Sequence, residues 1–569
     1  MKLSEKWNQD GRLKLLAALL MNLLFLLLLF ACYTPGYEEN DDFWMSRFVD
    51  GQLAEKTAFI PFVNIVQGLL LKLCFALGGD QLPWYTLCQY ALMLFSFSAV
   101  TWVLLRRFRL LPALTMTAII LLSSGMDAYL TLNFSKTAAI ATVGGLSLML
   151  FALEGGDQVR RRAVLWLGFG LALLGFLWRY EVFFTAAAIM APVGLTSMLY
   201  LLSRPAEAGG KLRQAWRYAR PFLLLLVTVV LLYGVNTLVW SRGEYGDFTQ
   251  YNKIRYVLMD YGTPPKYEQA EEFYRSMDMD ENAVSLLRSW NFYDTEKFSQ
   301  ENLEKITAQR DRILQKRSPG QCFLVLLTEC IPSFYVTPAF AAAGLTLLLW
   351  LLCGRRGWRE LLGAGLVLGF FCLIYMAMIY LNRCLINRVD MGLFLAVAMA
   401  FCFLMDEKKL EKRKVACGLA LLLALVLGSR AFPERCLLRR SYSAQDRSSE
   451  KAAVEVLLAD EEHLYLCKMS GIAEGLYGPL ETNPAGFGDR VVKLGGWSVK
   501  HPSVEHVLDR YDIQNPYPDM IGNEQVRLID NDVERTLAYL REYYDPGVQA
   551  EPVEPLSTET GLKVYRIYS

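Results

Sequence analysis

The chain has 569 residues, of which 54% are hydrophobic, and its formal net charge at pH 7 is +1. This balance lacks the strong positive charge of nucleic-acid-binding proteins and of basic proteins that coat membrane surfaces. The apolar residues gather in blocks, and about 20 apolar residues in a row are needed to cross the hydrocarbon core of a bilayer. The sequence therefore predicts a mainly α-helical, polytopic membrane protein that binds membrane lipids and no nucleic acid.

Eleven blocks are apolar enough to predict membrane spans. They cover residues 13–31, 85–105, 110–126, 134–153, 163–178, 182–202, 221–240, 323–352, 360–381, 391–405 and 415–430. The long block at 323–352 contains Pro332 and Pro338, so we expect a kink there, or a start outside the bilayer.

Lys and Arg residues gather in every second loop, which predicts the orientation of the chain. They occur at residues 2–14, 106–109, 160–162, 204–217, 355–359 and 408–414. Basic loops face the cytoplasm. We therefore expect a multi-pass protein of the plasma membrane with a cytoplasmic N-terminus and, because the number of spans is odd, an extracytoplasmic C-terminus.

The polar stretches between and after the spans predict two domains. The membrane domain covers residues 1–430 and carries external loops at 32–84 and 241–321. The second loop has helix-like stretches at 268–277 and 301–315. In the tail, 431–569, short apolar strands are expected at 463–467, 490–494, 525–529 and 564–568, with a helix at 533–543. Strands alternating with helices predict a small external α/β domain.

A cluster of acidic residues follows the first predicted span. It contains Glu38, Glu39, Asp41 and Asp42, and the apolar segment 61–77 after it is expected to lie as a helix at the membrane interface. Carboxylates beside a bilayer often mark a hydrated functional site. Repulsion between adjacent carboxylates raises the pKa of one of them, which makes that group a better general base. The alternative is a solvated loop that only anchors the first span.

Several charged residues lie where external turns are expected, against the usual charge bias. They are Lys136, Arg179, Glu181, Arg383 and Arg388. A lipid phosphate at the outer leaflet would explain the cations, because Arg binds phosphate in a bidentate manner and Lys supplies a point charge. In the alternative interpretation, Arg179 pairs with Glu181, Arg388 pairs with Asp390, or all of them reach lipid headgroups. Asp127 is expected to be an ordinary turn residue.

The three histidines, His463, His501 and His506, all lie in the tail. A His-based hydrolase site in the membrane domain is therefore excluded. The sequence also has no phosphate-binding loop of the Walker type and no dinucleotide fingerprint, so an ATP-driven transporter or a nicotinamide enzyme is not indicated. No metal-binding spacing of Cys and His is present.

An external first loop with paired acids, an interfacial apolar helix and many further spans resembles the GT-C glycosyltransferases. These enzymes use polyprenyl-phosphate sugars, as in the aminoarabinose-transferase and protein-mannosyltransferase groups. Asp41 and Asp42 match the acidic pair of that family's first loop, and residues 61–77 fit the helix that follows. The resemblance covers the layout of residues 10–200 and fades afterwards. The small α/β tail departs from the better-known members, so acceptor recognition cannot be carried over from them.

The resemblance implies an inverting sugar transfer at the outer face, to a glycan, lipid or protein acceptor. Asp41 would deprotonate or orient the acceptor hydroxyl, and Asp42 would hold the acceptor or, as an alternative, a divalent cation. No other cofactor is expected. The substrate-binding residues would be Glu39, Glu181 and the cations that neutralise the departing phosphate, namely Lys136, Arg179, Arg383 and Arg388.

Two other function classes remain open from the sequence. A flippase or transporter of a lipid-linked solute would want charged residues near the span centres and two related halves, and the sequence offers few of the first and no sign of the second. A non-catalytic envelope scaffold or sensor would use the tail as its binding module.

Overall fold

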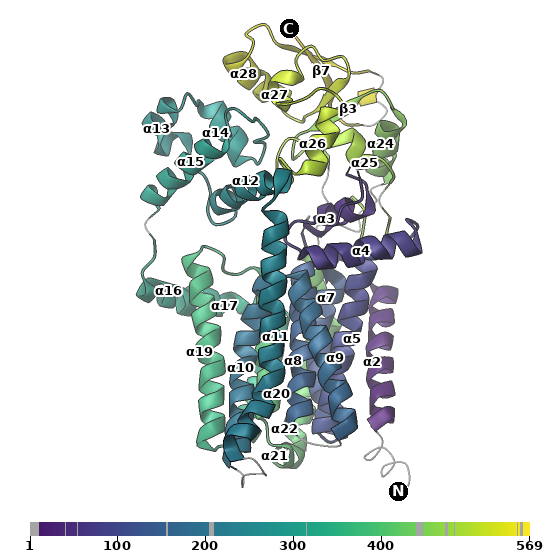
Figure 1. Ribbon diagram of the computed structural model, residues 1–569, viewed down its shortest axis with the longest axis vertical. Helices are drawn as coiled ribbons and strands as arrows, with labels where there is room; N and C mark the ends of the chain where they lie inside the picture. Colours follow the sequence, from purple (N-terminus) through teal and green to yellow (C-terminus); the bar gives the residue numbers. More distant parts are fainter. Residues whose placement is uncertain are drawn as a thin grey trace.

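The computed structural model describes residues 11–39, 41–53, 55–154, 158–203, 210–314, 316–439, 448–472, 476–482, 484–554, 556–557 and 561–569. Residues 2–10 and 204–209 of the basic loops lie outside the described residues, as does Asn40 of the acidic cluster. The molecule is long, with a bundle of helices below and a smaller part above it that contains loops, short helices and a sheet (Figure 1). The C-terminus lies at the end of the long axis that is far from the bundle.

Nine helices among the described residues are long and apolar enough to cross a membrane. They are α2 (Gly11–Cys32), α5 (Trp84–Arg107), the continuous segment Leu110–Leu130, α8 (Phe134–Glu154), α9 (Gln158–Trp178), α10 (Tyr180–Ser203), α11 (Gly210–Trp240), α19 (Trp358–Tyr380) and α20 (Asn387–Leu404). The segment Leu110–Leu130 comprises α6 (Leu110–Ile120), the π-helical turn η1 (Leu121–Gly125) and α7 (Met126–Leu130). The helices α8 and α20 are the most enclosed of these spans.

Two bent helix pairs raise the number of spans to as many as eleven. The first joins Pro319–Val336 to α18 (Ala339–Cys353) with a bend of 108°. Within it, α16 (Pro319–Val325), η3 (Leu326–Cys330), α17 (Ile331–Ser333) and η4 (Phe334–Val336) follow one another. Pro338 stands at the bend, where a missing backbone donor and a fixed φ interrupt the helix. The second joins α22 (Lys414–Ser429) to α23 (Ala431–Arg439) with a bend of 41°, and α21 (Glu407–Lys412) precedes it.

The first external loop folds over the upper end of the bundle, which we call the loop end. Strand β1 (Gly36–Tyr37) pairs in parallel with β2 (Thr131–Leu132), so this loop is fixed to the turn that precedes α8. Helix α3 (Asp41–Asp50) follows, and then α4 (Ile65–Gly78), which lies across the bundle (Figure 1). Leucines such as Leu69, Leu73 and Leu77 of α4 are exposed, as expected for an interfacial helix.

The second external loop forms short helices beside the sheet. They are α12 (Gly243–Met259), the 3-10 turn η2 (Tyr267–Gln269), α13 (Glu271–Ser276), α14 (Glu281–Arg288) and α15 (Gln300–Ile313). The backbone N–H of Tyr293, after α14, donates to the carbonyl of Leu494 in the tail at 3.0 Å. The loop and the tail therefore form one continuous structure above the bundle.

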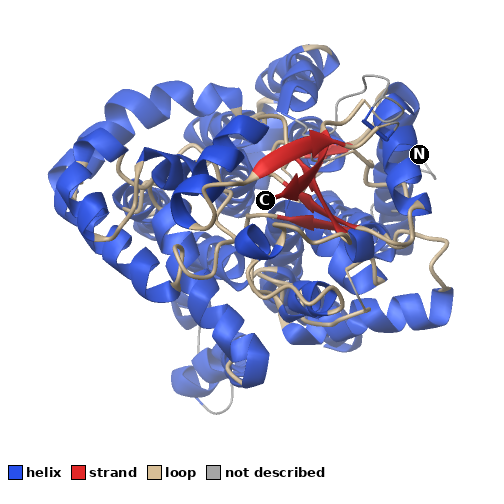
Figure 2. Ribbon diagram, turned by 90° about the horizontal axis from the view of Figure 1, so that it is seen from above, coloured by secondary structure: helices blue, strands red, loops and turns tan. Residues whose placement is uncertain are grey.

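The tail contains a five-stranded sheet in the order β4-β3-β5-β7-β6. Strand β3 (Leu464–Cys467) pairs in parallel with β4 (Val491–Lys493) and β5 (Val526–Ile529). Strand β7 (Val564–Tyr568) runs antiparallel to both of its neighbours, β5 and β6 (Gln549–Pro552). The helices are α24 (Ser448–Ala459), α25 (Phe487–Arg490), α26 (Pro502–Asp509), α27 (Pro516–Asp519) and α28 (Val533–Tyr543). Seen from above, the strands lie over the middle of the helices (Figure 2).

The predicted fold class is confirmed. The molecule is mainly α-helical, with many apolar helices of membrane-spanning length and a small sheet near the C-terminus. The expected break in the block 323–352 is the bend of 108°. Strand β6 and the short pair β1–β2 were not expected from the sequence, because none of these segments has the alternation of a half-buried strand.

Candidate active site

A cavity of about 530 Å³ lies at the loop end of the bundle, between the membrane helices and the tail. Five of the eight site residues expected from the sequence line it. Its charged side chains are Glu39, Asp41, Arg179, Arg255, Asp260, Arg383, Arg388 and Lys493, and its aromatic side chains are Trp44, Phe62, Phe134, Trp290 and Trp497. With five basic and three acidic groups, the cavity favours an anionic ligand.

Asp41 is the first residue of α3 and lines the cavity with a side chain that is 18% exposed. Burial raises the pKa of Asp41 above its usual value, Arg179 and Arg255 act in the opposite direction, and Asp260 reinforces the rise. A hydrogen bond from Trp497 also favours the ionised form of Asp41. A partly buried carboxylate that is oriented by a donor and has a raised pKa is suited to act as a general base.

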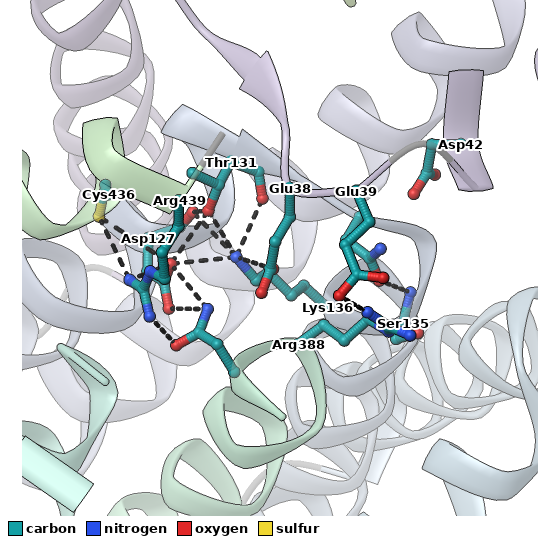
Figure 3. Close-up of polar contacts among 12 residues, drawn as sticks. Glu38, Glu39, Asp42, Asp127, Thr131, Ser135, Lys136, Arg388, Cys436 and Arg439 are labelled. Atoms are coloured by element: carbon teal, nitrogen blue, oxygen red, sulfur yellow. Dashed lines mark hydrogen bonds and ion pairs between the residues drawn. The ribbon is translucent and has the colours of Figure 1, made fainter. Parts of the chain in front are cut away.

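Four arginines approach the cavity from different elements. Arg388 forms an ion pair with Glu39 (Figure 3), and Arg179 donates to the hydroxyl of Ser135 at 2.6 Å. Arg179 also lies 3.7 Å from Glu181, as the alternative interpretation expected. Arg388 lies at the start of α20, and Arg179 lies at the junction of α9 and α10. The packing of the bundle therefore brings the two arginines together.

The other two arginines differ in how their charge is compensated. Arg255 of α12 is buried and lies 3.4 Å from Asp260, and burial lowers the pKa of Arg255. Arg383 donates to the backbone carbonyl of Asp260 at 3.1 Å. Within the described ranges, no carboxylate forms an ion pair with Arg383. Its guanidinium is therefore a positive charge in the cavity that an anion can use.

Asp42 does not line the cavity. It is fully buried and accepts hydrogen bonds from the Tyr85 hydroxyl at 2.9 Å, the Gln89 amide at 3.1 Å and the backbone N–H of Phe134 at 3.0 Å. Because Phe134 is the first residue of α8, Asp42 caps that helix and ties α3 to α5 and α8. Burial raises the pKa of Asp42 to about 7, against the effect of the Gln89 and Tyr85 donors.

Lys136 also lies away from the cavity, in a buried ionic network (Figure 3). Its ammonium lies 2.6 Å from Glu38 and 3.0 Å from Asp127, and it donates to the Thr131 hydroxyl at 2.6 Å. Asp127 also lies 3.2 Å from Arg439. Asp127 was expected to be an ordinary turn residue, but it is the centre of this network. Two carboxylates and two cations balance, so the network joins the first loop to α7, α8 and α23 without a surplus charge.

Glu181 is about half exposed and is not part of the cavity lining. The alternative pairing of Arg388 with Asp390 is not found, because the Arg388 partners are Glu39 and Asp41. Asp390 instead accepts from the Tyr375 hydroxyl at 3.3 Å.

The sequence did not indicate that the tail forms the roof of the cavity. Met469, just after β3, lines the cavity. So do Lys493, the last residue of β4, and residues 495–498, which follow it. These loops lie at the carboxyl ends of parallel strands, which is where α/β sheets bind ligands. Arg255 and Asp260 were missed as well. They lie in and just after a helix that has charged residues all along it, so sequence alone gave no reason to single them out.

His501 has a structural role at the start of α26. His501 is buried, its Nε2 lies 3.1 Å from the carbonyl of Phe59, and its Nδ1 accepts from the backbone N–H of Ser503 at the start of α26. Burial lowers the pKa of His501 to about 3. Across the described segments, no group of three or more His, Cys, Asp or Glu side chains is placed to hold a metal ion.

No family model matches the sequence. No curated protein matches it either. Among solved structures, the crystal structure of ArnT from Cupriavidus metallidurans in the apo state aligns over 94% of this chain and 94% of that chain, with 12% sequence identity and a TM-score of 0.38. A superposition this loose assigns no residue roles to this chain.

Proposed function

We propose that this protein is a membrane glycosyltransferase that moves a sugar from a polyprenyl-phosphate donor to an acceptor hydroxyl. The observation that carries the proposal is a partly buried carboxylate, Asp41, in one cavity with four arginines at the end of a bundle of apolar helices. The carboxylate supplies a base, the arginines a phosphate site, and the neighbouring bilayer a place for the lipid chain.

In the proposed reaction, Asp41 takes the proton of the acceptor hydroxyl. The acceptor oxygen attacks the anomeric carbon from the side opposite the phosphate and forms the new glycosidic bond. The bond between that carbon and the phosphate oxygen breaks, and polyprenyl phosphate leaves with the electron pair. This single displacement inverts the anomeric configuration.

The negative charge that develops on the leaving phosphate needs preorganised partners, and such stabilisation often dominates catalysis. Arg179, Arg383 and Arg388 are assigned this role, with Arg255 as a fourth candidate that the sequence did not suggest. Lys136 and Asp42 are assigned positioning roles, because they hold α8 and the first loop in place without touching the cavity.

The alternation of basic loops supports an orientation with the N-terminus in the cytoplasm and the cavity on the outer side of the plasma membrane. A glycan, a lipid or another protein can supply the acceptor hydroxyl there. The proposal requires no metal, because the arginines already provide positive charge at the phosphate. An essential divalent cation would be revealed by loss of transfer in the presence of a chelator and its recovery on adding Mg²⁺ or Mn²⁺.

The test is the transfer of radiolabelled sugar from a panel of polyprenyl-phosphate donors into a membrane extract that supplies acceptors. We expect transfer by the wild type and a loss of roughly 100-fold or more in Asp41→Asn, the range seen when a general base is removed. Asp80→Asn is the matched control, because Asp80 belongs to the same external loop and is 59% exposed. Full activity in a folded Asp41→Asn variant would disprove the role of Asp41. Binding of these lipids without transfer would favour a flippase instead.

A further inference from the structure

Trp290 lines the cavity with a backbone conformation that tryptophan rarely adopts. Its φ angle is +65°, in the left-handed region that costs free energy for a residue with a side chain. Such strain persists only where the surrounding structure imposes it, and it gathers at functional sites. Phe62, on the same cavity, has a φ angle of +68°. Two aromatic residues of one cavity are therefore held in costly conformations.

The loop after β4 holds Trp290 in place. The backbone N–H of Gly496 donates to the carbonyl of Trp290 at 3.2 Å. A Cβ atom at Gly495 would lie 1.5 Å from that carbonyl oxygen, so only glycine allows the two backbones to approach this closely. Gly496 itself has a φ angle of +82°. The tail thus fixes a residue of the second external loop, and the two segments together position the indole ring.

Trp290 lies next to Arg255, one of the proposed phosphate-binding residues. The guanidinium carbon of Arg255 lies 5.7 Å from the centre of the Trp290 ring. Asp41 and its hydrogen-bond partner Trp497 line the same cavity. In a polyprenyl-phosphate sugar, the sugar ring is bonded directly to the phosphate. A phosphate bound near Arg255 therefore brings the ring to Trp290, with its anomeric carbon in the space that Asp41 also faces.

We propose that Trp290 is the platform on which the pyranose ring of the donor stacks. This inference rests on the proposed glycosyltransferase function and adds the sugar subsite to it. The C–H bonds on one face of a pyranose form an apolar surface, and the indole ring offers a large, rigid and amphipathic partner for it. Stacking reads the ring face rather than single hydroxyls, so several hexoses should bind.

The test measures binding of polyprenyl phosphate and of its mannosyl, glucosyl and galactosyl derivatives to the purified full-length protein. For the wild type we expect at least one glycosylated lipid to bind about tenfold more tightly than polyprenyl phosphate. In Trp290→Ala this gain in affinity from the sugar should disappear. The Kd of the variant for polyprenyl phosphate itself should stay within about twofold of the wild-type value. Trp290→Phe should keep part of the gain. Trp166→Ala is the matched control, because Trp166 is 57% exposed on the span α9.

Gly496→Ala provides a second variant that leaves the indole present. A Cβ atom there has room, with its nearest neighbour, Met469 Cε, at 3.5 Å, but the positive φ disfavours alanine. We expect the loop to shift and the gain from the sugar to fall as in Trp290→Ala. The proposed stacking role of Trp290 would be overturned if Trp290→Ala still bound the glycosylated lipid more tightly than polyprenyl phosphate. It would also be overturned if the wild type showed no such preference for any of the three sugars. A wild type that does not bind polyprenyl phosphate would overturn the glycosyltransferase proposal itself.

Discussion

Arg388 lies 3.9 Å from the Asp41 carboxylate and forms its closer ion pair with Glu39. The guanidinium therefore lies nearer to Glu39 than to Asp41. A base needs this separation, since a close cation stabilises the ionised form, lowers the pKa and weakens the basicity of a carboxylate. The arrangement lets Arg388 serve the phosphate while Asp41 keeps its raised pKa.

Replacing Glu39 with Gln tests this division of roles. We expect Arg388 to move closer to Asp41 and lower its pKa, so that the acid limb of the pH profile of kcat/KM shifts to lower pH. The wild-type limb itself should lie above the usual carboxyl value of about 4, because the base is active only when ionised and burial raises its pKa. Transfer is thus lost as the pH falls through the pKa of Asp41. An unchanged limb in Glu39→Gln would show that Glu39 does not control Arg388.

The raised pKa of Asp42 should make the stability of the protein depend on pH. Its pKa is about 7 in the folded protein and about 4 in an unfolded chain. Between these values the folded state binds more protons, so the contribution of Asp42 to stability declines as the pH rises from about 4 to about 7. Asp42→Asn cannot ionise and should reduce this decline, which thermal unfolding in detergent at a series of pH values would measure. An identical slope in both proteins would contradict the prediction.

The sequence predicted the bundle and four of the five strands in the tail, because long and short apolar runs are local signals. Helix α28 has the predicted bounds of 533–543. The surroundings of the site residues were harder to predict. In the sequence, Asp42 and Lys136 look as suitable for a role in the active site as Asp41 does. In the structure, the pairing of β1 with β2 and the start of α8 place both side chains in the protein interior.

The residues that cover the cavity from the tail and the second external loop were also hard to predict from the sequence. Trp290 and Trp497 are separated by more than 200 residues of sequence, and no local pattern joins them. Their meeting depends on backbone contacts such as the one between Tyr293 and Leu494. The roles of Asp41 and of the arginines stay predictions until transfer is measured.

Arg383 should be essential for transfer, because its charge is not neutralised by any carboxylate among the described residues. We expect Arg383→Gln to lower kcat by about 100- to 1,000-fold, as found when one preorganised donor at a developing negative charge is removed. Arg275→Gln is the control, since Arg275 is largely exposed and pairs with Glu271 along α13. A loss that appears only in the KM for the acceptor would place Arg383 in acceptor binding instead.

Lys136 should contribute to stability rather than to chemistry. Replacing it with Met removes the ammonium that lies between Glu38 and Asp127, and these carboxylates stay buried. Breaking a buried ion pair from one side costs about 3–5 kcal/mol, so the unfolding temperature in detergent should fall by several degrees.

The control for this change is Lys305→Met, in an exposed pair with Glu301 on α15. Exposed pairs contribute at most about 1 kcal/mol, so this variant should unfold close to the wild-type temperature. If Lys136→Met unfolds like the control but loses transfer, Lys136 acts on the substrate after all. That outcome would mean that the first loop opens during the reaction, because in the present structure Lys136 is fully buried.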